Sequence, residues 1–97
     1  SARDPFNRDL VCNLGLVYGQ IDDLEAAAAL YRGYLEQHPE DTDVVARLAK
    51  VLFGAGELVA AQEAVRTVLQ REPEHAEARA LLTEISQGLG EDEAAQG

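Results

Sequence analysis

Apolar residues recur along this chain at the three- and four-residue spacing of an amphipathic α-helix. Leu10, Leu14 and Val17 follow this spacing, and it resumes after a short polar stretch. The pattern predicts one helix that begins near residues 7–9 and ends near residue 19. It predicts a second helix over about residues 23–37.

The same pattern repeats after 34 residues. The chain's three prolines, Pro5, Pro39 and Pro73, stand 34 residues apart. The same shift aligns two apolar columns, one of Leu14, Leu48 and Leu82 and one of Val17, Val51 and Ile85. Proline lacks an amide proton and disfavours helical geometry in the residue before it. We therefore expect each proline to follow the second helix of a helix pair and to direct the chain into the next pair.

Residues with special backbone or capping properties fall between the expected helices. Gly54 and Gly56 lie where the chain has to turn from the first to the second helix of a pair. Asp41 or Thr42 follows Pro39 and can accept the free amide protons of the next helix. The connections are therefore predicted to be short.

The residues in these columns resemble those of the tetratricopeptide repeat. In the first copy the matching residues are Val11, Leu14, Gly15, Tyr18, Ala27, Tyr31, Tyr34 and Pro39; in the second they are Val45, Leu48, Ala49, Leu52, Ala61, Val65, Val68 and Pro73. Gly15, Ala27, Ala49 and Ala61 are small where paired helices have to approach closely. Tyr34 and Val68 depart from the family's usual alanine and predict a slightly different spacing between units.

The resemblance implies an all-α fold, a right-handed α-solenoid of antiparallel helix pairs with about five helices. We expect residues 1–7 to be the closing turn of a preceding repeat, with units over residues 8–41 and 42–75. Residues 76–90 would form the first helix of a third unit and act as a cap. Residues 91–97 would be an acidic tail or a truncated second helix.

The charge of the chain restricts the kind of partner. Eight basic and eighteen acidic residues give a net charge of −10, which argues against binding to nucleic acid or to an anionic membrane. No apolar run is long enough to insert into a membrane. One lysine against seven arginines is typical of GC-rich coding and favours a bacterial source. The single cysteine is compatible with a reducing compartment, which favours the cytoplasm.

No catalytic, metal or cofactor site is expected from the sequence. His38 and His75 flank turns at different repeat positions and are interpreted as solvated. The acidic pairs lack the ordered ligand spacing of a calcium loop and are interpreted as acids at helix N-termini. Cys12 has no cation fixed beside it in sequence and is interpreted as a small, partly buried filler. We therefore expect a protein that is not an enzyme.

By resemblance, the first helix of each unit lines a concave groove that holds a peptide. The candidate groove residues are Asn13, Leu16, Gln20, Arg47, Lys50, Phe53, Leu81 and Glu84. We expect Arg47 and Lys50 to pair with an acidic group of the peptide, and Leu16, Phe53 and Leu81 to offer apolar anchors. In the alternative, Arg47 and Lys50 are solvated and balance Asp43 and Glu84.

Three functions remain open from the sequence. The first is a scaffold or adaptor module that binds a peptide of a protein partner. The second is a self-association module, a homo-oligomer formed through exposed repeat edges. The third is the recruiting arm of a larger protein whose enzymatic domain lies outside this chain.

Overall fold

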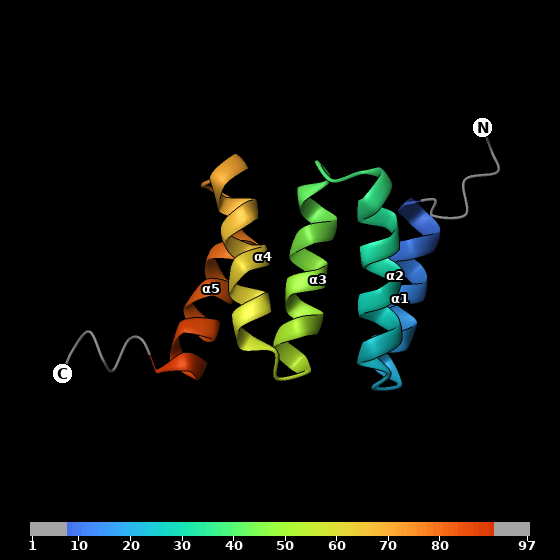
Figure 1. The fold of residues 1–97 in the computed structure, drawn as a ribbon, viewed down its shortest axis with the longest axis horizontal. Helices are drawn as coiled ribbons and strands as arrows, with labels where there is room; N and C mark the ends of the chain where they lie inside the picture. The colour runs from blue at the N-terminus through green and yellow to red at the C-terminus, as the bar shows by residue number, and fades with distance from the viewer. Residues whose placement is uncertain (1–7, 91–97) are drawn as a thin grey trace.

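Five α-helices make up the fold in the computed structural model, which describes residues 8–90 (Figure 1). They are α1 (Arg8–Gln20), α2 (Leu24–Gln37), α3 (Thr42–Gly54), α4 (Leu58–Arg71) and α5 (Ala76–Leu89). No strand occurs between residues 8 and 90. The prediction of an all-α helical repeat is therefore confirmed, and the first two helices have nearly the predicted bounds. The expected closing turn over residues 1–7 and the expected tail over residues 91–97 lie outside the described residues.

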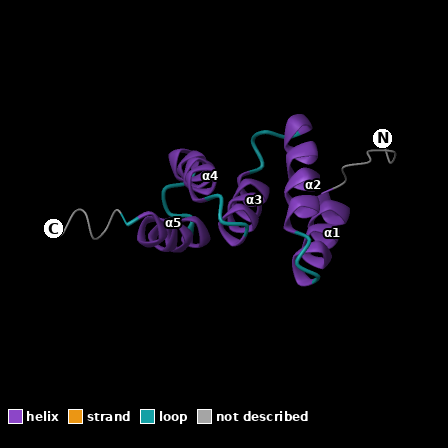
Figure 2. Ribbon diagram, turned by 60° about the horizontal axis from the view of Figure 1, so that its bottom comes forward, coloured by secondary structure: helices purple, strands orange, loops and turns teal. Residues whose placement is uncertain are grey.

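Consecutive helices pack against each other along the whole array. In Figure 2, α1, α3 and α5 lie along one side, and α2 and α4 lie along the other. The odd-numbered helices also meet directly where α3 contacts α5. The elements therefore form two layers, and each new helix pair extends the array lengthwise.

The turns between the two helices of a pair have a backbone conformation that recurs every 34 residues. Asp22, Gly56 and Gly90 have φ angles of 65°, 84° and 77°. This left-handed region is accessible to glycine without a steric penalty, whereas Asp22 adopts it with a side chain. Gly56 therefore serves the predicted turn. Gly54, by contrast, is the last residue of α3, and a Cβ on it would lie 3.5 Å from Cδ1 of Leu24, so its small size matters for packing.

Side chains and prolines set the helix ends, largely as the sequence predicts. The Asp41 carboxylate accepts the Val44 amide proton at 3.4 Å and caps α3. Asp23 does the same for Ala26 at the start of α2, at 3.3 Å. The helices α2 and α4 end at Gln37 and Arg71, just before Pro39 and Pro73. Thr42, the other candidate cap, is instead buried and donates its hydroxyl proton to Glu72.

The core is built from small and medium apolar residues. Ala27, Ala49 and Ala61 are fully buried, as are Val65 and Val68. Alanines at these contacts let the helix axes approach, and each buried valine contributes roughly 1.5–3 kcal/mol of hydrophobic stabilisation. Aromatic bulk enters this core at only a few points, chiefly through Tyr31 and Tyr34 of α2.

Candidate functional site

A groove lies on the side of the array formed by α1, α3 and α5. It consists of two adjoining hollows, of about 330 and 340 Å³. The first is lined by Gly15, Leu16, Gly19, Gln20, Leu24, Tyr31, Arg47, Lys50, Val51 and Glu77. The second is lined by Ala46, Lys50, Phe53, Gly54, Glu77, Ala80, Leu81 and Glu84. Because Lys50 and Glu77 line both hollows, the two are treated as one groove.

The floor of the first hollow depends on the absence of a side chain at Gly15. Tyr31 of α2 is 97% buried, yet its ring end passes Gly15 and lines the hollow. A Cβ on Gly15 would overlap the Tyr31 hydroxyl. Burial raises the pKa of this hydroxyl above its ordinary value, and the nearby Arg47 guanidinium works in the opposite direction. Arg47 is thus held beside the hollow by a residue from the other layer.

Charge is distributed unevenly along the groove. Arg47 lines only the first hollow, whereas Glu84 lines only the second. Between them, Lys50 and Glu77 border both. All four side chains are exposed, and within residues 8–90 neither Arg47 nor Lys50 forms an ion pair. The groove therefore offers two cations near α1 in a molecule that is strongly acidic as a whole.

Seven of the eight candidate groove residues line the groove. Leu16, Gln20 and Arg47 line the first hollow, Phe53, Leu81 and Glu84 the second, and Lys50 both. Asn13 is exposed on α1 but lines neither hollow.

The expectation that all groove positions are exposed is wrong for Leu81, which retains only 8% of its surface. The physical reason is the direct packing of α5 against both α3 and α4, which covers this part of α5. Ala46 of α3 is buried in the same region. Leu81 can therefore form the floor of the second hollow, but it cannot project into a ligand.

A second polar cluster lies at the N-terminal ends of α1, α3 and α5. Arg8 of α1 donates from Nε to Asp41 Oδ2 at 2.9 Å and from Nη2 to Asp43 Oδ2 at 3.1 Å. Tyr34 of α2 also donates to Asp41 Oδ2, at 2.6 Å. His75 of α5 meets the other oxygen of Asp43 at 3.1 Å. These five residues form an inter-repeat hydrogen-bond chain that links α1, α2, α3 and α5.

This chain explains why residue 34 is a tyrosine rather than the alanine usual in the family. The Tyr34 side chain is buried, and its hydroxyl reaches the carboxylate that caps α3. Burial, together with this hydrogen bond, raises the pKa of Tyr34 to about 12. Burial alone would raise the pKa of Asp41, but the hydrogen bonds from Tyr34 and Arg8 and the charge of Arg8 hold it below its ordinary value.

His75 is the N-cap of α5, which corrects its interpretation as a solvated turn residue. Its side chain is only 11% exposed, and its Nδ1 accepts the Ala78 amide proton at 3.2 Å. His38 is half-buried, and its ring stacks on Tyr34 with the centroids 4.6 Å apart. Both rings therefore have structural contacts at the ends of helices.

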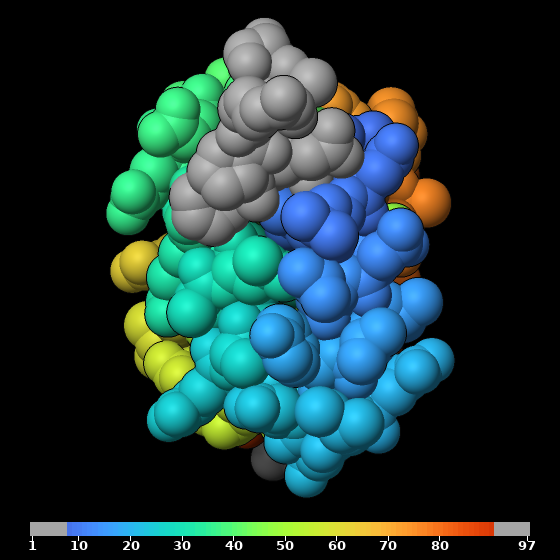
Figure 3. All heavy atoms as spheres, turned by 90° about the vertical axis from the view of Figure 1, so that its right-hand side faces the viewer, coloured from blue at the N-terminus to red at the C-terminus, as the bar shows by residue number. Residues whose placement is uncertain are grey.

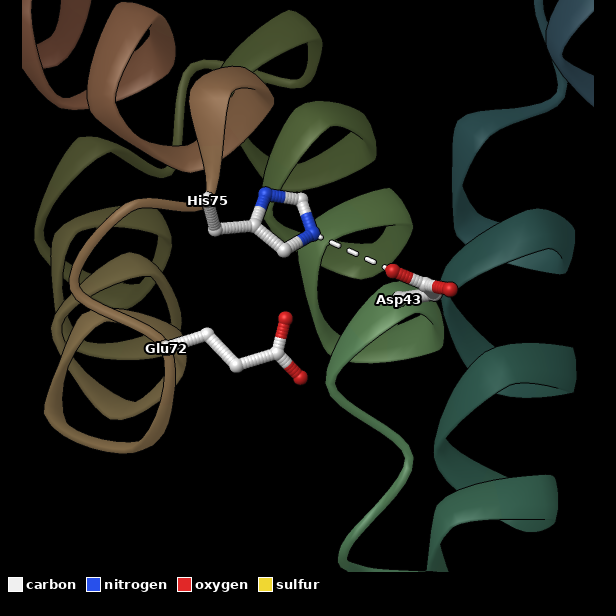
Figure 4. Close-up of side chains that lie close together, drawn as sticks. All are labelled: Asp43, Glu72 and His75. Atoms are coloured by element: carbon white, nitrogen blue, oxygen red, sulfur yellow. Dashed lines mark hydrogen bonds and ion pairs between the residues drawn. The ribbon is translucent and has the colours of Figure 1, made fainter.

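Asp43, Glu72 and His75 form the one group of possible metal ligands found within residues 8–90 (Figure 4). Their donor atoms lie within 4.8 Å of one another. However, the Nδ1 lone pair of His75 already accepts the Ala78 amide proton, so the proton of the neutral ring is on Nε2, facing Asp43. A metal at Nε2 would have to displace that proton and break the helix cap. The three side chains are therefore arranged as a hydrogen-bonded contact between α3 and α5.

Sequence reasoning missed several residues of these two clusters. It treated Tyr31 as a space-filling residue, although the signal that it lines the groove was present in the glycine at position 15. It did not connect Arg8 or Tyr34 with Asp41, because those contacts join residues from different helices. Within residues 8–90, no helix has the length and apolar character needed to cross a membrane.

Comparison with known proteins agrees with the geometry of the helix pairs. The family model described as "Tetratricopeptide repeat" matches residues 22–85, which is about two thirds of the chain. The match runs from the turn before α2 to the middle of α5. A search of curated proteins found no match to the sequence.

Proposed function

This chain belongs to the tetratricopeptide repeat family, whose repeats generally mediate protein–protein interaction, and we propose that its groove binds a peptide segment of a partner protein. Repeats of this family are typically non-catalytic. The proposed role is therefore that of an adaptor or scaffold that recruits a partner without altering it chemically.

The observation that carries this proposal is the pair of exposed cations in the groove. Arg47 and Lys50 are one helical turn apart on α3 and both border the first hollow. Neither has a carboxylate partner within residues 8–90, although the chain carries eighteen acidic residues. A carboxylate of a bound peptide can accept charge-assisted hydrogen bonds from both, and Arg47 can bind it with two parallel bonds. The partner segment is therefore acidic at this point.

Apolar surface beside the two cations supports the same proposal. Leu16 projects from α1 with 56% of its surface exposed, and Phe53 is half-buried at the second hollow. A partner side chain that covers Leu16 would bury apolar area at about 25 cal/mol per Å². Each hollow is near the lower size limit of small-molecule pockets, which suits one or two side chains of a peptide.

The test is a selection from a random peptide display library on the immobilised chain, followed by binding measurements with the selected peptides. Selected peptides are expected to share an Asp or Glu next to an apolar residue. Their affinity is expected to fall at least about 10-fold for the Arg47→Ala, Lys50→Ala double variant. The matched control is the Arg32→Ala, Arg66→Ala variant, which removes two exposed cations from α2 and α4 and should bind normally. Equal losses in both variants, or none in the first, would contradict the proposal.

A further inference from the structure

The outer face of α1, at the end of the array, carries a line of exposed apolar side chains. Leu10, Val17 and Ile21 retain 48%, 47% and 65% of their surface, and the half-buried Leu14 lies between them. These residues share one side of the helix because their spacings are three, four and seven. In Figure 3, which views this end of the molecule, α1 and α2 lie side by side.

The corresponding side of α3 and α5 is covered. Val44 and Ala78, which follow Leu10 by one and two repeats, are fully buried. Leu48, one repeat after Leu14, is 8% exposed, and Ile85, two repeats after Val17, is fully buried. Positions that are exposed on the first helix are therefore buried on the third and the fifth, although their residue types are similar.

Contacts at the glycines identify the covering helices as α2 and α4. Cδ1 of Leu24 in α2 lies 3.5 Å from the position of a Cβ on Gly54 of α3. One repeat later, Cδ1 of Leu58 in α4 lies 3.1 Å from the corresponding position on Gly88 of α5. The same interface therefore occurs twice, with a leucine near the start of one helix placed over the end of the next.

We propose that the outer face of α1 binds the second helix of a repeat that precedes Arg8 in the polypeptide. This helix would run antiparallel to α1, as α2 does to α3, with a leucine over Gln20, the residue one repeat before Gly54. Pro5, one repeat before Pro39, provides the closing turn that such a helix needs.

A second copy of this chain fits the same face less well. The only helices of the required kind, α2 and α4, are already packed between their neighbours in each copy. Two copies would also bring together net charges of −10. This proposal concerns the end of the array and does not depend on the groove.

The test is an extended chain in which a copy of residues 22–34 is placed directly ahead of Ser1. Ser1 stands one repeat before Leu35, so the extension keeps the 34-residue register and retains the full chain. The midpoint temperature of unfolding is expected to rise by about 5 °C or more, because each repeat interface adds to the stability of an array.

Val17→Glu distinguishes a docked extension from one that merely adds helix. In the unextended chain it should change the midpoint temperature little, because the side chain is half exposed. In the extended chain it should abolish the gain. The control, Val59→Glu at an exposed valine of α4, should behave identically in both chains. No gain on extension, or an equal effect of Val17→Glu in both chains, would overturn the proposal. Dimerisation of the unextended chain that Val17→Glu abolishes would assign the face to a second copy and overturn it as well.

Discussion

The side chain of Tyr31 occupies the space that a β-carbon would take at Gly15. A Cβ there would lie only 2.8 Å from Cε1 of the tyrosine and even closer to its hydroxyl. Through this gap α2 contributes to a groove otherwise lined by α1, α3 and α5, and it reaches Arg47. Helix packing and groove chemistry thus depend on the same pair of residues.

Gly15→Ala is therefore expected to destabilise the fold by about 1–3 kcal/mol, because the buried Tyr31 ring has to move. Urea denaturation measures this change. Gly19→Ala, four residues later on the same helix, is the control, since its Cβ would meet no atom within 4 Å. It should stabilise the helix by about 0.5–1 kcal/mol. Similar effects of the two substitutions would contradict this account of the groove floor.

The neighbouring residues Asp22 and Asp23 are expected to respond in opposite directions. Asp22→Gly should stabilise the protein by about 1 kcal/mol, because Asp22 has a φ of 65° where the later repeats have glycine. Asp23→Ala should cost about 0.5–2 kcal/mol, because Asp23 caps α2. Both substitutions remove one negative charge, so thermal unfolding of the two variants separates the backbone effect from electrostatics. A loss of stability in Asp22→Gly would refute the strain argument.

Acid should weaken the inter-repeat hydrogen-bond chain through Asp41. The pKa of Asp41 is lowered in the folded state, so its contribution is complete above the ordinary value of 3.8 and is lost as the pH falls through the lower folded value. The free energy of unfolding should therefore decline more between about pH 6 and about pH 3 in the parent than in Asp41→Asn, which keeps the cap. Urea denaturation at the two pH values measures this difference. An identical decline in both proteins would show that Asp41 makes no such contribution.

Divalent metal ions should not stabilise the protein at Asp43, Glu72 and His75. The proton on Nε2 of His75 and the helix cap made by Nδ1 both oppose coordination. Addition of Zn²⁺ is therefore expected to leave the midpoint temperature unchanged at neutral pH. A rise that His75→Ala abolishes would show instead that the three side chains rearrange to bind a metal.

The helices could be predicted because their determinants are local and repeated. The period of the prolines, the capping carboxylate of Asp41 and the small residues Ala27 and Ala61 all follow from the sequence, and the structure has them in these roles. The 34-residue shift also related Asp22 to Gly56, which proved to share a left-handed backbone.

Features that depend on contacts between distant residues could not be predicted in the same way. Leu81 has the pattern of an exposed groove residue, and only the packing of α5 against α3 and α4 shows that it is buried. His75 is an uncommon helix cap, so its sequence position carried no signal. The hydrogen bonds of Arg8 join residues 33 and 35 positions apart, and their pairing follows only from the stacked helices.

The most direct test of the proposed function is an NMR titration of the chain with a peptide selected from the display library. The account predicts that amide chemical shifts change around Leu16, Gln20, Arg47, Lys50 and Phe53, and that signals around Arg32 and Arg66 on the other layer stay in place. Changes centred on α2 and α4, with the groove signals unaffected, would contradict the claim that the groove holds the partner peptide.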